Sequence, residues 1–378
     1  MSDLLKKIIN FAVKKHNDMK RIIFLILAVI SVNAYAQPKQ IYSPTCNADG
    51  SVTFTLKAPH AKYVELACQC LTKNVPMQKD DAGLWTVTIT PEEPDIYPYN
   101  FIVDGTSVND PGNKLLFPNE FFKQSILEMP NANPLYYTQD VPHGKVEYVT
   151  YYSEQFKQWR PLVIYIPASY SKDTDKNYPV FYLMSGTIDT EETWTKLGKA
   201  NVIADNLIAQ GKAEEMIIVM PFGYINEDTA PGWSEGSIPQ YKVFENDFVN
   251  GIMPFVEKNY RTINDADHRA IAGFSRGGGQ ALFVGYRNID KFHSVIAFSS
   301  WLTAAHFEHI PNFLTDVKQL KMHWLYVGEK DPYFQHVKKN IDLLNNKNVK
   351  ADFFTTKHAH TWMHCRIVLS EALQKLFK

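Results

Sequence analysis

The sequence predicts an α/β fold in which a doubly wound sheet follows a small immunoglobulin-like β-sandwich. Two observations predict it. Residues 37 to about 129 contain short alternating strands separated by turns such as Asp-Gly, without a helical period. The later part contains a buried strand that turns sharply into a helix over residues 269–284, and further apolar strands at 322–328 and 351–356. An amphipathic helix then carries Ile367, Leu369, Leu373 and Leu376.

The N-terminal segment resembles an export signal. Lys20 and Arg21 precede an apolar run at 22–32, and Ala34-Tyr35-Ala36 fits a small-x-small cleavage site. Residues 19–36 are therefore predicted to be a signal peptide, with a mature chain that begins at Gln37. The apolar run is shorter than the roughly 20 residues that a membrane span needs, and no cysteine stands directly after the cleavage site to accept a lipid. We expect a periplasmic or secreted protein without a membrane span in the mature chain.

Residues 37–129 form the predicted sandwich. Its strands are expected at 51–56, 63–67, 84–89 and 97–103, and turns at Asp49-Gly50, Asp81-Ala82-Gly83 and Asp104-Gly105 separate them. Trp85 and Tyr99 lie at strand positions, where aromatic side chains more often pack in a core than bind a ligand. The Pro130–Pro134 segment indicates a linker over 130–145, so that the second domain covers 146–378.

Gly273-Phe274-Ser275-Arg276-Gly277 has the Gly-x-Ser-x-Gly form of a nucleophile elbow. It lies between the predicted strand at 269–272 and the helix that begins near Gly278, which is the context that the motif requires. The glycines allow a strained turn that exposes the serine hydroxyl. Ser275 is therefore the predicted nucleophile of an α/β-hydrolase.

A carboxylate and a histidine follow in the chain order that this fold uses. Asp331 comes three residues after Gly328, which ends an apolar strand, and Glu329 is the reserve candidate. His360 lies in the loop after the last strand. An imidazole can take the serine proton, and a carboxylate fixes its tautomer. The backbone N–H groups of Arg276 and of Thr187, or of Ile188 in place of Thr187, are the predicted oxyanion hole.

From about Val146 onwards the chain resembles the esterase D-like α/β-hydrolases, and within them the feruloyl esterases of carbohydrate esterase family 1. The resemblance rests on the elbow, on His360-Thr361-Trp362 and on the segments 179–186, 194–208, 219–223 and 254–261. It implies the same triad of Ser275, Asp331 and His360, and a hydroxycinnamoyl ester on plant cell-wall xylan or a feruloylated oligosaccharide as the substrate. The region around Trp85 and 97–105 resembles the early-set sandwiches of carbohydrate-binding module family 48.

The chain departs from the family at a few positions. Ser185-Gly186 stands where the family commonly has His-Gly, Arg276 where it has Met, and Cys365 where many relatives have Trp. Arg276 is expected to be a solvated arginine at a helix start, with an anionic substrate group as the alternative contact. Trp233, Trp301 and Trp362 are candidates for the substrate pocket, with plain packing as the alternative.

Other functions stay open on the sequence alone. A siderophore trilactone esterase of the enterochelin type or an acetyl xylan esterase would use the same triad, and the off-pattern Ser185 and Arg276 leave room for a catalytically weak glycan-binding protein. The formal net charge is −1, which argues against nucleic acid as a partner. No phosphate-binding motif is present, and no cofactor is expected.

Two clusters of metal or thiol ligands need an interpretation. His358, His360, His364 and Cys365 contain zinc-type donors, but their spacing runs from a loop into a helix start, and no metal is expected. Cys68 and Cys70 are two residues apart on one strand, where a mutual bridge is strained. Pairing of Cys46 with either one, or free thiols, remain open.

Overall fold

The structure, a computed structural model, describes residues 42–225, 238–302, 304–307 and 317–378, together with Lys7 and Lys14. The predicted signal peptide at 19–36 lies outside the described residues. Contacts group Ser43–Lys378 into one unit. Within the described ranges, none of the helices has both the length and the apolar character that crossing a bilayer requires.

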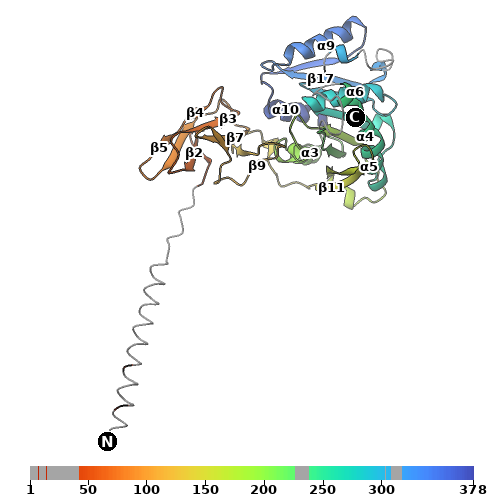
Figure 1. Ribbon diagram of the computed structural model, residues 1–378. Coiled ribbons are helices and arrows are strands. Elements are labelled where there is room, and N and C mark those ends of the chain that lie inside the picture. The colour runs from red at the N-terminus through yellow and green to blue at the C-terminus, as the bar shows by residue number, and fades with distance from the viewer. Residues whose placement is uncertain (1–6, 8–13, 15–41, 226–237, 303, 308–316) are drawn as a thin grey trace. The chain divides into compact units, whose positions relative to one another are not determined.

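The N-terminal β-region, residues 43–129, folds into two sheets (Figure 1). One has the order β1-β2-β6-β5 and the other β4-β3-β7-β10-β9, with β8 paired to β7. Along β2 and β3, fully buried residues alternate with partly exposed ones, as the sequence pattern predicts. The strands are β1 (Thr45–Cys46), β2 (Val52–Lys57), β3 (Val64–Cys68), β4 (Val75–Pro76), β5 (Gln78–Lys79), β6 (Leu84–Ile89), β7 (Ile96–Val103), β8 (Thr106–Val108), β9 (Leu116–Phe117) and β10 (Gln124–Glu128).

Local chemistry explains the turn between β7 and β8. Asp104 and Gly105 have φ angles of 47° and 86°, the left-handed pair that a two-residue hairpin needs. The Asp104 carboxylate accepts the Tyr63 N–H at 2.8 Å. In the core beneath, Trp85 and Tyr99 are only 5% and 0% exposed, so both act as core residues and present no open ring face to a ligand.

The second part of the chain is built on an eight-stranded sheet of order β11-β12-β14-β13-β15-β16-β17-β18. The β11–β12 and β12–β14 pairs are antiparallel, and all later pairs are parallel. The strands are β11 (Lys145–Ser153), β12 (Gln158–Ile166), β13 (Val180–Met184), β14 (Ile217–Pro221), β15 (Arg269–Phe274), β16 (Ser294–Phe298), β17 (Met322–Gly328) and β18 (Asp352–Thr356).

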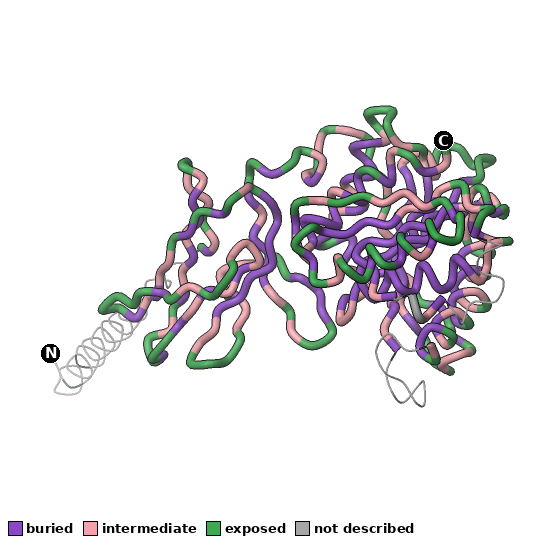
Figure 2. The backbone as a smooth tube through the Cα atoms, turned by 90° about the horizontal axis from the view of Figure 1, so that it is seen from above, coloured by how far each residue is buried: buried purple, intermediate pink, exposed green. Residues whose placement is uncertain are grey.

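Helices cover both faces of this sheet, which confirms the doubly wound α/β prediction (Figure 1). Side chains of β13 alternate between two apolar cores: Tyr182 belongs to the core that includes residues of α4, α5, α6 and α9, and Phe181 to the core that includes residues of α3 and α10. The central strands β13, β14, β15 and β16 are buried along their whole length, whereas the edge strands β11 and β18 are partly exposed (Figure 2). The helices are α2 (Thr193–Lys196), α3 (Ala200–Ala209), α4 (Ile238–Asp247), α5 (Met253–Asn259), α6 (Arg276–Arg287), α7 (Ala304–Phe307), α9 (Phe334–Asn346) and α10 (Trp362–Leu373), with short turns η1 (Pro134–Tyr136), η2 (Ala168–Ser171), η4 (Phe248–Ile252), η5 (Ala266–His268) and η6 (Val317–Gln319).

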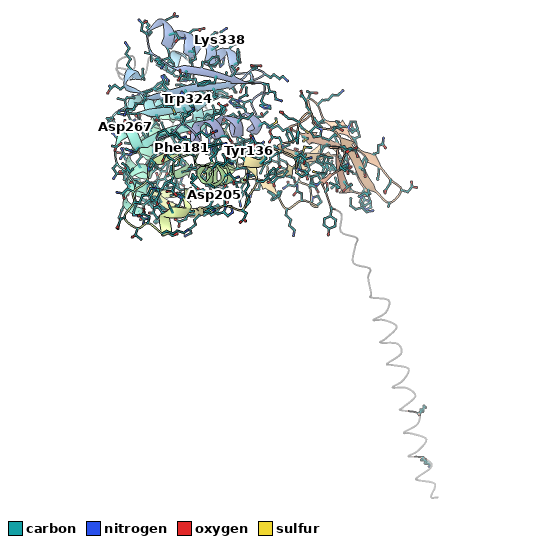
Figure 3. All side chains as sticks on the ribbon, turned by 180° about the vertical axis from the view of Figure 1, so that it is seen from behind. Tyr136, Phe181, Asp205, Asp267, Trp324 and Lys338 are labelled. Carbon is teal, nitrogen blue, oxygen red and sulfur yellow. The ribbon has the colours of Figure 1, made fainter. Side chains whose placement is uncertain are left out.

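The β-region shares a core with the sheet. Ile96, Phe117 and Ile126 belong to the same apolar cluster as α3 and α10. The predicted linker is also packed: Tyr136 is 4% exposed, and Asp205 of α3 accepts the Gly144 N–H at 2.8 Å (Figure 3). The residues at 130–145 therefore hold the two β-structures together through side-chain contacts.

All four cysteines lie in the described part of the chain, and none forms a disulfide. The sulfur atoms of Cys68 and Cys70 are 2.8 Å apart, and burial raises the pKa of Cys68 well above its usual value. Cys365 lies on α10 and is fully buried in the apolar core that this helix covers. Of the arrangements that the sequence left open, this structure has free thiols.

Candidate active site

Ser275 lies on a sharp turn between β15 and α6. Its φ of 56° and ψ of −115° are strained for a non-glycine residue. Three backbone hydrogen bonds hold the turn, because the Ser275 N–H donates to Phe298 O at 2.9 Å and its carbonyl accepts from Gly279 and Trp301. A Cβ on Gly273 would lie 2.3 Å from the Gly277 carbonyl carbon, and a Cβ on Gly277 2.5 Å from Ser185 O. The two glycines of the motif are required by close backbone contacts.

Asp331 and His360 are paired. The Nδ1 of His360 lies 2.8 Å from Asp331 Oδ2, and the Tyr333 N–H donates to Asp331 Oδ1 at 2.8 Å. Burial alone would raise the pKa of Asp331, but the hydrogen bonds that it accepts from His360 and the Tyr333 N–H, together with the charge of His360 when that ring is protonated, hold this pKa below its usual value. Because an ionised carboxylate can only accept, Nδ1 carries the hydrogen and Nε2 is left as the basic nitrogen. Glu329 is engaged elsewhere, by Thr355 Oγ1 at 3.0 Å.

The three predicted triad residues share one edge of the sheet. Ser275, Asp331 and His360 follow the carboxyl ends of β15, β17 and β18, which are aligned by parallel pairing. The ring of Phe274, next to the serine, lies 4.5 Å from the His360 ring, and the Tyr333 ring lies 5.0 Å from it on another side. These two aromatic rings hold the imidazole beside the elbow.

A tight loop after β13 lies against the elbow. The Gly186 N–H donates to Asp189 Oδ2 at 3.0 Å, and Ile188 has a left-handed φ of 59°. Burial raises the pKa of Asp189 to about 7, with partial compensation from the Gly186 N–H and the charge of Arg276. Thr187 lies within this loop, and Arg276 is the first residue of α6. The predicted oxyanion donors therefore lie on adjacent segments.

The position of Arg276 corrects the sequence interpretation. Its side chain is not solvated, because the residue is only 1% exposed, and its guanidinium lies 5.5 Å from the centre of the Tyr224 ring. Burial raises the pKa of Glu120, and the charge of Arg276 offsets part of that rise. Glu120 belongs to the β-region, and its N–H donates to Ile188 O at 2.8 Å. A segment of the β-region thus contacts the loop that carries Thr187.

The three tryptophans proposed for the pocket differ in placement. Trp233 lies outside the described residues. Trp301 is half-buried, with its ring 5.1 Å from that of Tyr333, so it lies next to the residue that contacts the imidazole. Trp362 is 3% exposed and packs 4.9 Å from Trp194 in the core, which speaks against a direct substrate contact.

The histidines of the suspected zinc cluster have separate partners. His358 Nδ1 lies 3.4 Å from Glu93 of the β-region, and His364 Nδ1 lies 2.8 Å from Thr356 Oγ1, while His360 faces Asp331. Within the described ranges, no group of three or more His, Cys, Asp or Glu side chains is arranged to hold a metal ion. The residues present do not form a zinc site.

Sequence reasoning missed several residues around the site. Tyr333 and Phe274 contact the imidazole, and Asp189 shapes the loop after β13. The Asp331-Pro332-Tyr333 order places an aromatic beside the carboxylate, which was a usable signal. The contact between Glu93 and His358 joins residues far apart in the chain and has no local signal.

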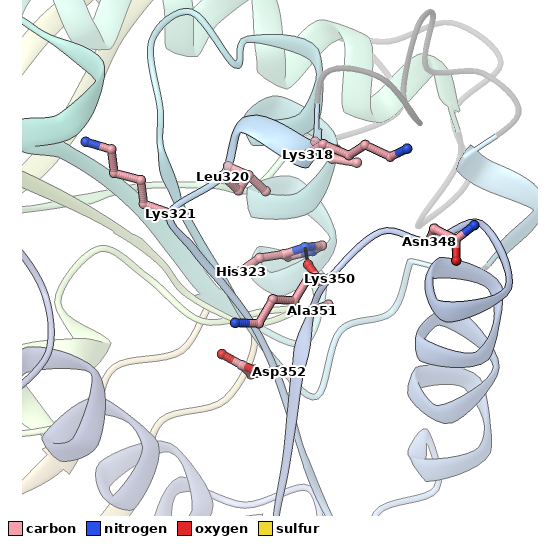
Figure 4. Close-up of a pocket in the computed structure, with 9 residues that line it drawn as sticks. Lys318, Leu320, Lys321, His323, Asn348, Lys350, Ala351 and Asp352 are labelled. Carbon is pink, nitrogen blue, oxygen red and sulfur yellow. Dashed lines mark hydrogen bonds between the residues drawn. The ribbon is translucent and has the colours of Figure 1, made fainter.

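A separate hollow of about 340 Å³ lies at the other edge of the sheet (Figure 4). Lys318, His323, Lys350 and Asp352 line it, at the amino ends of β17 and β18. His323 is held by the Lys350 carbonyl at 3.0 Å and by the Tyr286 hydroxyl. The hollow is therefore distinct from the edge that carries Ser275.

Known proteins resemble this chain in sequence. A model of the family described as putative esterase matches residues 153–364, which include Ser275, Asp331 and His360. The endo-1,4-beta-xylanase/feruloyl esterase of Xylanibacter ruminicola is 30% identical over 356 residues, covering 92% of this chain and 47% of that protein. The chain thus spans about half the length of this curated relative.

Solved structures agree on the fold. A ferulic acid esterase of Anaeromyces mucronatus matches with a TM-score of 0.54 at 25% identity, over 65% of this chain and 96% of the other. The enterobactin esterase of Shigella flexneri matches with a TM-score of 0.66 over 91% and 98% of the two chains. At 17% identity, the second match shows a common fold alone.

Proposed function

We propose that this chain, which belongs to the esterase family, hydrolyses carboxylic esters and is a serine feruloyl esterase that releases hydroxycinnamic acids from plant cell-wall xylan. The observation that carries the mechanism is the 2.8 Å contact between His360 Nδ1 and Asp331, at the sheet edge that holds the Ser275 elbow. The similarity to a xylanase/feruloyl esterase over 92% of the chain supports the substrate class.

In the proposed reaction, Ser275 Oγ attacks the ester carbonyl while His360 Nε2 takes its proton. The N–H groups of Arg276 and Thr187 stabilise the negative oxygen. His360 then gives the proton to the departing sugar alcohol, and the acyl group remains on Ser275. Water, deprotonated by the same nitrogen, attacks the acyl-enzyme and releases the acid. Asp331 keeps Nδ1 protonated and orients the ring throughout.

The aromatic ring of the acyl group is proposed to lie near Trp301. This side chain is half-buried beside Tyr333, which in turn contacts His360. A flat phenolic ring packs well against such side chains. Trp233 remains a second proposed pocket residue.

The test is ester hydrolysis by the wild type and by Ser275→Ala. Release of ferulate is measured from methyl ferulate and from feruloylated xylo-oligosaccharides, beside acetylated xylan and a ferric trilactone siderophore. Loss of the nucleophile is expected to lower turnover on the order of a millionfold, with an unchanged circular dichroism spectrum. Substantial activity in Ser275→Ala would refute the triad. A wild type that prefers the siderophore or the acetyl ester would refute the feruloyl assignment, and no hydrolysis at all would favour a glycan-binding protein.

Export is a further part of the proposal. The signal at 19–36 is expected to be removed in a secreting host, so that N-terminal sequencing of the exported protein begins at Gln37. An exported protein that retains residues 19–36 would contradict this.

A further inference from the structure

Three large aromatic side chains are exposed on the hairpin formed by β11 and β12. Trp159 is 69% exposed, Tyr148 55% and Tyr152 43%. Of the described tryptophans, Trp159 is the one that is exposed. Exposed apolar side chains that gather in one place mark binding surfaces more often than isolated ones do. The mechanism proposed above uses none of these three residues.

The pairing register places the three rings on one face. Tyr152 is directly opposite Trp159, and their ring centres are 5.6 Å apart. Tyr148 lies four residues before Tyr152 on the same strand, and side chains separated by an even number of residues share a face. The three residues form a stripe, called here the aromatic stripe, which runs along the hairpin for roughly 13 Å at the usual rise per residue.

The stripe begins at the edge of the sheet that holds the candidate active site. β12 runs antiparallel to β14, and Leu162 pairs with Pro221 at the carboxyl end of β14. Arg160 continues past that point, since its Nη2 donates to the carbonyls of Phe222 and Tyr224 at 2.7 and 2.9 Å. Trp159, the residue before Arg160 in the chain, lies on the opposite face of the strand.

The segment that Arg160 holds leads directly to the elbow. The Tyr224 ring lies 5.5 Å from the guanidinium carbon of Arg276, the residue after Ser275. Burial raises the pKa of Glu120, and the charges of Arg276 and Arg160 each offset part of that rise, so both guanidinium groups lie near this carboxylate. The end of β12 where the stripe begins is therefore linked to the elbow through Arg160, the segment 222–224 and Arg276.

The other end of the stripe leads to a groove. The Lys196 ammonium lies 5.9 Å from the centre of the Tyr148 ring and also lines a groove of about 440 Å³ with Leu115 and Leu116. These two leucines are 44% and 40% exposed. Lys196 therefore lies between the Tyr148 end of the stripe and this groove.

The chemistry of the stripe selects its occupant. At the tip of the hairpin, Lys157 and Glu154 pair at 2.6 Å, and at its other end Lys145 and Glu147 pair at 2.7 Å. Little net charge is left to attract a nucleic acid or a charged peptide. The C–H groups on the faces of a sugar ring are slightly positive and pack well on the negative face of an indole or phenol.

We propose that the aromatic stripe of Tyr148, Tyr152 and Trp159 binds the polysaccharide chain of the substrate by stacking of sugar rings, while the ester bond lies at Ser275. The choice of arabinoxylan as the polymer rests on the proposed function. The stripe raises the local concentration of esters on a polymer and makes no contact with the acyl group. A second copy of the chain paired along the edge strand β11 is the competing occupant.

Binding is tested without turnover. In the Ser275→Ala background, retention on soluble arabinoxylan is measured by affinity electrophoresis for the parent, for Trp159→Ala and for Trp159→Phe. We expect Trp159→Ala to weaken binding about tenfold, because truncation of an aromatic anchor commonly has an effect of this size. Trp159→Phe is expected to keep most of the binding, because it keeps a ring face. The matched control is Tyr63→Ala, an exposed tyrosine of the β-region, which should bind like the parent.

Turnover provides the second test. For the active enzyme, Trp159→Ala should lower kcat/KM on feruloylated arabinoxylan about tenfold more than on methyl ferulate, through KM. Equal losses on both substrates, or unchanged retention, overturn the inference and leave the feruloyl esterase assignment intact. Absence of ferulate release by the wild type refutes the proposed function, and the retention assay still tests the stripe. Conversion of a dimer to a monomer by Trp159→Ala, with unchanged retention, would identify the surface as a contact between copies.

Discussion

Replacement of Asp95 by alanine should be among the most destabilising single changes in this protein. Asp95 lies just before β7, and its Oδ1 is 2.7 Å from Nη2 of Arg366 on α10. The Arg366 side chain is fully buried, and that of Asp95 is 10% exposed. Arg366 also donates to the carbonyls of Ile96 and Leu197 at 2.8 and 3.0 Å. These acceptors are neutral, so removal of the Asp95 carboxylate would leave the Arg366 charge without a counterion.

The expected size follows from this burial. Removing one partner of a buried ion pair leaves an uncompensated charge and costs about 3–5 kcal/mol of unfolding free energy. Asp95→Asn keeps an oxygen acceptor at the same place and should lose less. Urea unfolding at pH 7, followed by circular dichroism, measures the unfolding free energy of both variants. The slope of this free energy against urea concentration should equal that of the wild type, because the surface exposed on unfolding is the same.

The control is the exposed pair of Lys157 and Glu154, whose side chains are 72% and 78% exposed at a distance of 2.6 Å. Glu154→Ala should give no measurable change, because solvent screens such a pair. An Asp95→Ala protein that is as stable as Glu154→Ala would refute the reasoning, since Arg366 would then have found water or another acceptor. A large loss in Asp95→Ala would show that α10 depends on the β-region.

Three further predictions concern the site. His360→Ala should lower ester hydrolysis nearly as much as Ser275→Ala, and His358→Ala much less, because His360 pairs with Asp331 and His358 with Glu93; equal losses in steady-state turnover would leave the base undecided. Asp189→Asn should remove a pH dependence of stability. Burial raises the pKa of Asp189 from 3.8 to about 7, so between these pH values the carboxyl is protonated in the folded protein and ionised in the unfolded chain. The wild type therefore loses stability as the pH rises through that window. The difference between wild type and variant should change by about 4 kcal/mol from pH 4 to pH 8 in urea titrations, and parallel curves would contradict the raised pKa. EDTA should leave hydrolysis unchanged, because a serine triad uses no cation; stoichiometric zinc that is lost together with activity would revive the cluster of His358 and His364.

Local sequence was sufficient for the elbow and for several of the strands, but not for β10, β11 and β12. The turn at Ser275 needs small neighbours at Gly273 and Gly277 because the backbone itself would collide with any side chain there. This requirement concerns residues that are adjacent in the chain, and it is therefore visible as a sequence motif. The alternation of buried and exposed residues in β2 is also a local signal, because successive side chains of a strand point to opposite faces and only one face is buried.

The order of the chain also predicted the pairing of Asp331 with His360. Both residues follow the carboxyl ends of strands, and parallel strands bring those ends to one edge. The sequence could not decide whether Asp331 or Glu329 contacts the His360 ring, because this depends on the direction of each side chain. The structure places Asp331 beside the imidazole, while Glu329 is occupied by Thr355.

Tertiary structure alone decided the environments of individual side chains. Arg276, expected in solvent, is buried beside Tyr224, and Trp362 lies in the core beside Trp194. A side chain at a helix start can point to solvent or into the protein, and the neighbours that decide come from other segments. No periodicity records such neighbours.

The role of the β-region shows the same limit most clearly. Asp95 reaches Arg366 and Glu93 reaches His358 across more than 260 positions of the chain, and the separation of 271 for the first pair carries no local signal. Sequence patterns report what a residue needs from its own strand or helix. Contacts between elements depend on how two completed surfaces meet, and the chain acquires those surfaces only when both have folded.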